Sequence, residues 1–455
     1  MIVILSAGLM ALWGATIAVG VALIVRRRFV LGALLILEGA LATAAQYALS
    51  TIPMGIGDPL LRVTRSELLI AAGVGAIAFA ITLAVLLRKR DAATNAFKSK
   101  PAAIAAPLLM PLLAAGALYG LSQLSIPERE RERDPNKRAI EMPAGFSANL
   151  YAHDIPDNPT AMAFAPGGRL FIADISGAIW QGEEISGAHT LGAVTKFADG
   201  FNLITGLAWR GDELYVSSAG KVEALRDTNG DGTADARRTL VDGLPALIFM
   251  PHSNNALTFG PDGRLYFGVG ATSDGGRETR QYAASILSIS PDGGDVKVVA
   301  TGFGNPFKVA FNKAGDLFSG DNQGLASPDG APPPDEFNYI APGGDYNDLD
   351  LNNAAAREPL VQFPVHATPV GMAFYEGDTY PPEYLDNAFV ALWSRGEVAR
   401  IMLTKTPQGD YRAAPAVWAR GFLYPIDVVS GPDGNLYVAD FGTRVIYRIT
   451  YDASH

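Results

Sequence analysis

Residues 251–267, PHSNNALTFGPDGRLYF, decide the fold of this chain. They join a polar segment that carries His252 to an apolar strand, a Pro-Asp-Gly turn and a second alternating strand, which is the signal of a β-hairpin. Similar hairpins recur roughly 45 to 63 residues apart, in copies that begin at Pro159, Ile204, Asn254, Pro306, Pro369 and Pro425. Each interval is long enough for one four-stranded antiparallel blade, so the repeat predicts an all-β, six-bladed β-propeller.

The predicted propeller occupies residues 142–455. Residues 147–152 alternate like a strand and precede the first repeat. We expect them to close the ring by completing the last blade, beside residues 445–449.

The N-terminal part of the chain, residues 1–125, is strongly apolar. Residues 2–25 contain no charged side chain, and about 20 apolar residues are enough to cross a bilayer. The pattern predicts a bundle of four transmembrane helices, at about 2–25, 29–49, 68–87 and 102–124. Residues 126–141 are charged and are interpreted as a solvated linker.

The distribution of Lys and Arg predicts the orientation of this bundle. The loops at 26–28 and 88–100 are the most basic, and basic loops favour the cytoplasm. We therefore expect a multi-pass protein of the cell membrane whose propeller lies on the periplasmic or extracellular side. Glu38 lies near the middle of the second span, where it either contacts a proton or quinone pathway or forms a hydrogen bond between helices.

Composition excludes several classes of function. The chain contains no cysteine, which rules out disulfides, thiolate metal sites, iron–sulfur clusters and covalently attached haem. The formal net charge of -10 argues against nucleic acid as a partner, because that affinity depends on cations that neutralise phosphates.

The first strand of each blade lines the axis of a propeller, so residues that enter these strands should converge on one mouth of the central channel. The residues at these positions are mostly polar, as expected of a small-molecule site: Asn158, Asn202, His252, Asn305, His366 with Thr368, and Tyr424. His252 is the candidate general base. Asn158 is better explained as a residue that satisfies a loop backbone.

The propeller resembles the glucose/sorbosone dehydrogenase family over about residues 142–450. The resemblance lies in MPAGFSANLYA, HSNNALTFGPDGRLYFGVG, GFGNPFKVAF, GDNQG with PPPDEFNYIAPGGDYN, PVHATPVGMAFYEGDTYPPEYLDNAFVAL and PDGNLYVADFGTRVIYRI. The resemblance implies a six-bladed propeller outside the cytoplasm that oxidises sugars with pyrroloquinoline quinone (PQQ) and calcium.

Carried over by position, the resemblance makes His252 the catalytic base, which takes the hydroxyl proton while hydride passes to the quinone. It places Asn202, Asn305 and Arg395 beside the cofactor. It also implies that the backbone carbonyls of the turn Gln323-Gly324-Leu325 hold an active-site calcium ion.

Three positions depart from the family pattern. Gly304 stands where the family has arginine, Ala271 where an aspartate is common, and Tyr424 where a basic residue precedes the last blade. Because PQQ carries three carboxylates, the loss of two cations would weaken its binding unless other side chains compensate. The candidates are Asp274 for the missing acid, and Arg277, Arg280, Lys308 or Arg420 for the missing cations.

A second calcium site is suggested by the stretch DTNGDGTAD, which resembles the first nine residues of an EF-hand loop. Its oxygen-bearing residues are Asp227, Asn229, Asp231 and Asp235. The twelfth position is Arg238 instead of glutamate, so a polar hairpin turn remains the alternative to structural calcium.

These features favour a membrane-anchored quinoprotein oxidoreductase that oxidises a sugar or a related polyol or aldehyde and passes electrons to membrane quinone. The alternative is a non-catalytic propeller with a degenerate PQQ site that binds carbohydrate or a protein partner, which the three departures favour. A hydrolytic propeller would need several acids at the axis, where the sequence has amides.

Overall fold

The computed structural model describes residues 134–246, 252–273, 278–323, 332–346 and 356–454. All of them belong to one compact unit, Glu132–His455. The predicted transmembrane spans and Glu38 lie outside the described residues. Within the described ranges, no helix is long and apolar enough to cross a membrane. The helices seen there are short 3-10 turns, namely η2 (Pro135–Lys137), η3 (Pro382–Tyr384) and η4 (Trp393–Arg395).

The described residues form six four-stranded antiparallel sheets, as predicted. Blades 1 to 3 comprise β2 (Pro159–Phe164), β3 (Leu170–Asp174), β4 (Ile179–Gly182) and β5 (Thr195–Ala198); β6 (Ile204–Arg210), β7 (Glu213–Ser218), β8 (Lys221–Arg226) and β9 (Ala236–Asp242); and β10 (Asn254–Phe259), β11 (Leu265–Val269), β12 (Ser285–Ile289) and β13 (Lys297–Thr301).

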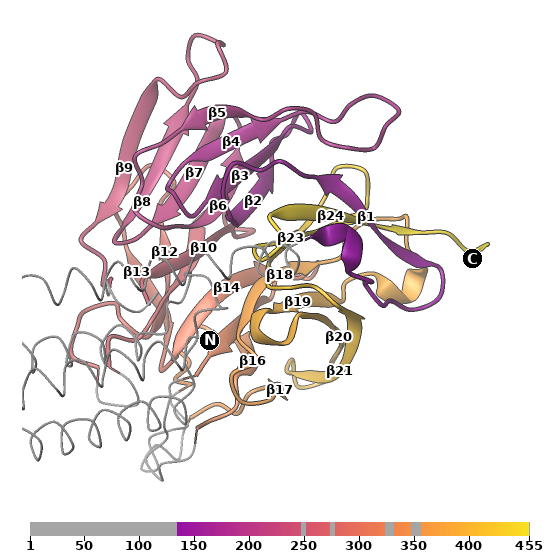
Figure 1. The fold of residues 1–455 in the computed structure, drawn as a ribbon. Coiled ribbons are helices and arrows are strands. Elements are labelled where there is room, and N and C mark those ends of the chain that lie inside the picture. The colour runs from indigo at the N-terminus through magenta and orange to yellow at the C-terminus, as the bar shows by residue number, and fades with distance from the viewer. Residues whose placement is uncertain (1–133, 247–251, 274–277, 324–331, 347–355, 455) are drawn as a thin grey trace, which may run out of the picture. The chain divides into compact units, whose positions relative to one another are not determined.

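Blades 4 to 6 comprise β14 (Asn305–Phe311), β15 (Leu317–Asn322), β16 (Glu336–Ile340) and β17 (Val361–Gln362); β18 (Pro369–Phe374), β19 (Ala388–Leu392), β20 (Glu397–Lys405) and β21 (Tyr411–Arg420); and β22 (Pro425–Ser430), β23 (Leu436–Asp440), β24 (Val445–Tyr451) and β1 (Phe146–Ala152). The first strands of successive blades contact one another, and β22 contacts β2, so the six blades close into a ring in chain order (Figure 1).

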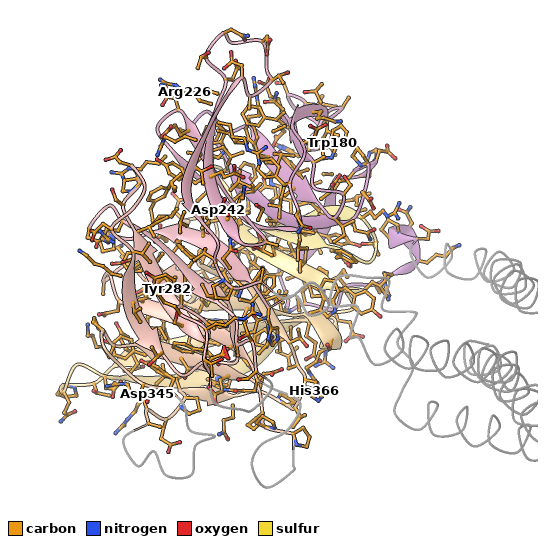
Figure 2. The ribbon with its side chains drawn as sticks, turned by 90° about the vertical axis from the view of Figure 1, so that its left-hand side faces the viewer. Trp180, Arg226, Asp242, Tyr282, Asp345 and His366 are labelled. Carbon is orange, nitrogen blue, oxygen red and sulfur yellow. The ribbon has the colours of Figure 1, made fainter. Side chains whose placement is uncertain are left out.

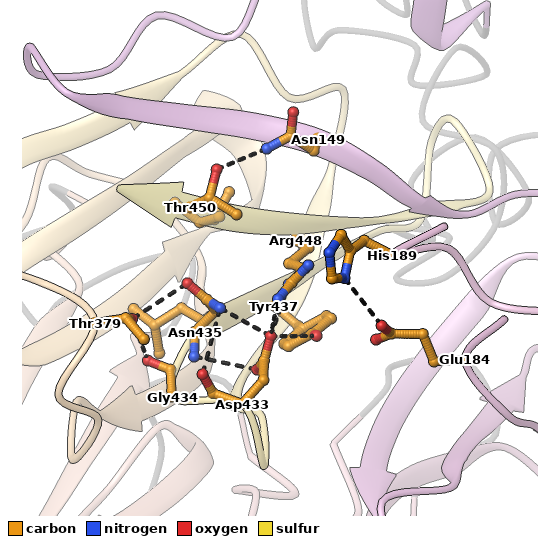
Figure 3. Close-up of polar contacts among 12 residues, drawn as sticks. Asn149, Glu184, His189, Thr379, Asp433, Gly434, Asn435, Tyr437, Arg448 and Thr450 are labelled. Atoms are coloured by element: carbon orange, nitrogen blue, oxygen red, sulfur yellow. Dashed lines mark hydrogen bonds and ion pairs between the residues drawn. The ribbon is translucent and has the colours of Figure 1, made fainter. Parts of the chain in front are cut away.

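The ring closes through a strand from the start of the propeller. β1 pairs antiparallel with β24, from Phe146 opposite Tyr451 to Ala152 opposite Ile446. Across this pair, the Asn149 Nδ2 group donates a 2.8 Å hydrogen bond to Thr450 Oγ1 (Figure 3). The predicted closure of the last blade by residues 147–152 is confirmed.

The repeated Pro-Asp-Gly turn of blades 3 and 6 holds a tyrosine on its aspartate, and in blade 3 the Tyr266 hydroxyl donates to Asp262 at 2.9 Å. In blade 6, the carboxylate of Asp433 accepts hydrogen bonds from the Tyr437 hydroxyl (3.1 Å) and from Arg448 Nε (2.7 Å), as Figure 3 shows. Gly434 follows with φ +78, and a Cβ on Gly431 would lie 2.2 Å from the Tyr437 ring. The first glycine makes room for the tyrosine and the second makes the left-handed turn.

The hydrophobic core consists of side chains packed between neighbouring blades. Between blades 4 and 5, Phe318 stacks on Phe337 with ring centroids 5.6 Å apart, packs at a tilt against Phe374 and makes an edge contact with Tyr411. Burying one such side chain stabilises the fold by about 1.5–3 kcal/mol. This interblade packing holds the first strands in place around the axis.

Candidate functional site

The mouth, as defined here, is the end of the propeller where the first strand of each blade begins and the second strand ends. The loops that enter β10 and β14 bring His252 and Asn305 to it. Residues 247–251, 274–277, 324–331 and 347–355 lie outside the described part of the chain. The predicted Gly324, Leu325 and Asp274 therefore have no structural account, and neither does Arg277.

His252 is partly buried just before β10, and its Nδ1 atom lies 2.9 Å from the carbonyl oxygen of Ala271. A carbonyl oxygen can only accept, so Nδ1 carries the proton and donates. In the neutral imidazole, Nε2 then holds the lone pair. This is the tautomer that a proton-accepting base requires.

Asn305 begins β14 and is 3% exposed. Gly270 lies between it and His252: a Cβ on Gly270 would be 2.6 Å from Asn305 Oδ1 and 2.9 Å from His252 Cβ. The glycine therefore allows a close approach of the two segments that any larger residue would prevent. The structure brings the predicted base and the predicted amide together, as expected.

Asp321, at the end of β15, holds the segment that enters β14. Its buried carboxylate accepts hydrogen bonds from the backbone N–H groups of Gly304 (3.0 Å) and Asn305 (2.7 Å). The Gly304 carbonyl in turn accepts a 2.6 Å hydrogen bond from the Ala271 N–H. The backbone that fixes the His252 tautomer is thus tied to the backbone that carries Asn305.

The departure at Gly304 has a structural cause. A Cβ at this position would lie 2.4 Å from the Asn322 carbonyl oxygen and 3.0 Å from Gln323 Cα. The neighbouring atoms belong to the backbone, so they cannot move aside cheaply. This loop conformation excludes an arginine as well as any smaller side chain.

Gln323 and Thr368 are joined by Asp335, a buried acid that the sequence did not single out. The Asp335 carboxylate accepts the backbone N–H of Gln323 at 2.8 Å and that of Thr368 at 2.7 Å. Burial raises the pKa of Asp335, although these two hydrogen bonds oppose the shift. Thr368 has φ +59, a strained conformation for a β-branched residue, and its hydroxyl lies 2.8 Å from that of Ser394.

Blade 6 repeats the arrangement seen around Asp321. Asp440, the last residue of β23, accepts the backbone N–H groups of Leu423 (2.7 Å) and Tyr424 (2.9 Å), and burial raises its pKa. The Tyr424 ring packs against Trp393 with centroids 5.2 Å apart. An acid at the end of the second strand therefore supports the mouth in both blade 4 and blade 6.

The other predicted mouth residues do not share one environment. Asn158 donates a 2.6 Å hydrogen bond from Nδ2 to the Phe441 carbonyl, which confirms its role in satisfying a loop backbone. The side chains of Asn202 and His366 are exposed, and Figure 2 labels His366 at the surface of the propeller.

Three of the cations considered for anion binding have acidic partners. Arg395 Nε donates to Glu397 Oε2 at 2.7 Å, and Arg420 lies 3.7 Å from a carboxylate oxygen of Glu141. Lys308 is 11% exposed and its Nζ donates to Asp427 Oδ1 at 2.8 Å. Arg280 is exposed.

The pair formed by Lys308 and Asp427 connects the first strands of blades 4 and 6. In the strand register, Lys308 lies opposite Gly320 and Asp427 lies opposite Ala439. Lys308 and Asp427 therefore occupy equivalent positions on the first strands of blades 4 and 6. The first strand of blade 5 carries Gly371, where a Cβ would lie 2.3 Å from Asp427 Cα, so the glycine lets β18 approach the backbone of β22 closely. Asp427 Oδ2 also accepts the Met162 N–H of blade 1 at 3.0 Å. Lys308 therefore links the first strand of blade 4 to that of blade 6, and through Asp427 to blade 1.

The EF-hand-like stretch forms the turn between β8 and β9. Asp227 accepts the N–H groups of Gly230 and Gly232, at 2.7 and 2.8 Å, while Asn229, Asp231 and Asp235 cap neighbouring N–H groups. Hydrogen bonds from the backbone and side chain of Thr228 lower the pKa of Asp235. In the described part of the chain, no cluster of three or more His, Asp or Glu residues is arranged to hold a metal ion. Calcium at this loop stays a prediction.

Comparison with solved structures supports the propeller fold. The chain is similar to the PQQ domain of pyranose dehydrogenase from Coprinopsis cinerea (16% identity, 69% of this chain and 97% of that one, TM-score 0.57). It is also similar to the PQQ-bound aldose sugar dehydrogenase of Streptomyces coelicolor (19%, 70% and 99%, TM-score 0.53) and to the soluble aldose sugar dehydrogenase of Escherichia coli (19%, 68% and 100%, TM-score 0.54). At these identities the likeness establishes the fold.

Among curated proteins, the chain is similar to an uncharacterized protein of Borreliella burgdorferi (strain ATCC 35210 / DSM 4680 / CIP 102532 / B31). The two are 22% identical over 361 residues, which cover 69% of this chain and 91% of the relative. A family model matches residues 133–449, nearly the whole propeller. The chain therefore belongs to the family described as a domain of unknown function, DUF7133.

Proposed function

We propose that this protein is a quinoprotein oxidoreductase that oxidises a sugar or a related polyol or aldehyde with PQQ. The observation that carries the proposal is the juxtaposition of His252 and Asn305 across Gly270 at the mouth of a six-bladed propeller. The structural neighbours support it, because two of them are named as a PQQ domain and as a PQQ-bound aldose sugar dehydrogenase.

The role proposed for His252 follows from its tautomer. With Nδ1 donating to the Ala271 carbonyl, Nε2 of the neutral ring can accept the proton of a substrate hydroxyl. PQQ, when bound, would accept the hydride that leaves the substrate carbon bearing this hydroxyl group. A positioned general base contributes about 10²–10⁴-fold to the rate of such a step.

The residues at the mouth fit the cofactor in their hydrogen-bonding groups. Gly270 lets the amide of Asn305 and the segment that carries His252 lie close together, and Asn202 is exposed at the same end. Asn202, Asn305 and Arg395 would hold the cofactor, with the Arg395 side chain, 41% exposed, exchanging part of its pairing with Glu397 for a carboxylate. Calcium would bind at the turn that begins with Gln323.

The cellular setting is also a proposal. Four strongly apolar stretches and the basic loops between them support a multi-pass anchor in the cell membrane, with the propeller on the periplasmic or extracellular side. An anchor of this kind would bring the propeller to membrane quinone as the electron acceptor. Glu38 is the acid within these stretches that would contact such a quinone.

One observation favours a second candidate, a non-catalytic propeller that binds carbohydrate or a protein partner. The backbone excludes an arginine at position 304, and Arg395 and Lys308 are paired with acids. A site short of free cations would hold a tricarboxylate weakly.

The test uses the full chain, supplied with PQQ and calcium chloride. We expect the absorbance of the cofactor to stay with the protein through gel filtration and a redox dye to be reduced with at least one aldose. His252→Ala should retain the cofactor and lose turnover. The control variant His366→Ala, which changes an exposed histidine at the mouth, should retain both the cofactor and turnover. Loss of the cofactor from the wild type would favour the binding module, and turnover in His252→Ala would remove the histidine from its role.

A further inference from the structure

Asn255, the second residue of β10, contacts Asn305 inside the propeller. It is fully buried, and its Nδ2 group donates to Asn305 Oδ1 at 2.8 Å and to the Pro306 carbonyl oxygen at 3.2 Å. Asn255 is absent from the residues that the sequence or the family resemblance assigns to the site.

The Pro306 carbonyl fixes the orientation of both amides. Because a backbone carbonyl can only accept, the Asn255 atom that faces it must be the NH₂ nitrogen. The Asn305 atom that faces the same nitrogen must then be its oxygen. The amide of Asn305 is thereby held with its oxygen toward Asn255 and Gly270 and its NH₂ group turned to the opposite side.

We propose that Asn255 is a positioning residue, which makes Asn305 present a hydrogen-bond donor to the ligand at the mouth. The inference rests on the proposed function and deepens it. The Ala271 carbonyl holds the proton on His252 Nδ1 and so leaves Nε2 as an acceptor. In a similar way, the Pro306 carbonyl orients the Asn255 amide, which in turn leaves the NH₂ group of Asn305 as a donor. The site therefore offers one oriented donor beside one oriented acceptor, which suits a ligand that places a carbonyl or carboxylate oxygen next to a hydroxyl group.

Asn255→Asp is the variant that tests this orientation. The introduced carboxylate has no proton to donate, so the Asn305 amide turns to donate its own NH₂ group to that carboxylate and presents its oxygen to the mouth. We expect the affinity for PQQ, measured by absorbance titration with calcium at pH 8, to fall about ten- to a hundred-fold. The loss relative to wild type at the same pH should shrink at acidic pH, because the introduced acid, once protonated, again donates to Asn305.

The chain offers a matched control in the preceding residue. Asn254 is equally buried, but its Nδ2 group donates to Ser217 Oγ and to the Ser218 and Lys221 carbonyls of blade 2. Asn254→Asp should destabilise the fold to a similar extent and leave the affinity for PQQ unchanged.

A double-mutant cycle separates positioning from general damage. In an Asn305→Ala background, Asn255→Asp should have no further effect on PQQ affinity. Wild-type affinity in Asn255→Asp, or an equal loss with and without Asn305, would overturn the proposal.

If the wild type binds no PQQ, the proposed function is refuted, but the contact between Asn255 and Asn305 can still be tested. The positioning contact is then judged from denaturant midpoints of the full chain. Asn255→Ala and Asn305→Ala should lower the midpoint non-additively, whereas Asn254→Ala and Asn305→Ala should be additive. Additivity of the first pair would overturn the contact between Asn255 and Asn305.

Discussion

Removing one partner of the ion pair between Lys308 and Asp427 should destabilise the whole propeller. Lys308 and Asp427 are 11% and 4% exposed, lie 2.8 Å apart and connect the first strands of blades 4 and 6, with a further bond from Asp427 to the Met162 N–H of blade 1. Lys308→Met leaves the Asp427 carboxylate buried without its cation. A buried charge that has lost its partner costs about 3–5 kcal/mol.

The double variant Lys308→Met/Asp427→Leu removes both charges. The Met162 and Val428 N–H groups then lose the Asp427 carboxylate as acceptor, but no charge is left buried without a partner, and each unpaired N–H costs about 1–3 kcal/mol. We therefore expect the double variant to be more stable than Lys308→Met, even though it changes more residues. The assay is urea unfolding of the full chain at pH 7, followed by tryptophan fluorescence, with midpoints compared at constant slope.

The control is the surface pair of Lys196 and Asp199, which has a similar distance of 2.9 Å but side chains that are 49% and 62% exposed. Lys196→Met should cost less than about 1 kcal/mol. The reasoning is refuted if Lys308→Met is no more costly than Lys196→Met, or if the double variant is less stable than either of its single variants.

Three further predictions concern the loops and turns. Gly304→Ala should lower the urea midpoint and weaken PQQ binding, because its Cβ meets the Asn322 carbonyl oxygen; unchanged binding would contradict this. Gly431→Ala should lower the midpoint through its contact with the Tyr437 ring, without affecting the mouth. Burial raises the pKa of Asp335, so the folded state takes up a proton more readily than the unfolded state. Compared with Asp335→Asn, the wild type should gain stability as pH falls below neutral; an opposite slope would contradict the burial argument.

The sequence was sufficient for the blade number because the hairpin signal is local and repeated. The Gly-Pro-Asp-Gly turn specifies its own geometry within seven residues, from Gly431 to the Tyr437 ring that lies over it. The strand alternation of residues 147–152 likewise predicted the closure of the last blade. Entry into the first strands then placed His252 and Asn305 at one mouth.

The contacts that specify the site chemistry were not predictable in the same way. Lys308 reaches Asp427 over 119 residues, from the first strand of blade 4 to the first strand of blade 6. The sequence offers Lys308 as one of four candidate cations for the cofactor, and its ion pair with Asp427 is a contact that the sequence does not indicate. Such contacts depend on which blades face each other, which no local pattern encodes.

The glycine at 304 shows a second limit of the sequence. Read as a missing arginine, it indicates only a lost charge. In the structure it is a position where backbone atoms of Asn322 and Gln323 leave no space for any side chain. Likewise, the sequence analysis does not single out the acids Asp321 and Asp440, whose role as acceptors for the mouth loops depends on the folded position of those loops.

The central claim is tested most directly by a crystal structure of the full chain soaked with PQQ and calcium chloride. The account predicts cofactor density at the mouth, in contact with the Asn305 NH₂ group and with His252 Nε2 facing the substrate side. Density at any other position, or a His252 side chain directed to the rim of the propeller, would contradict it.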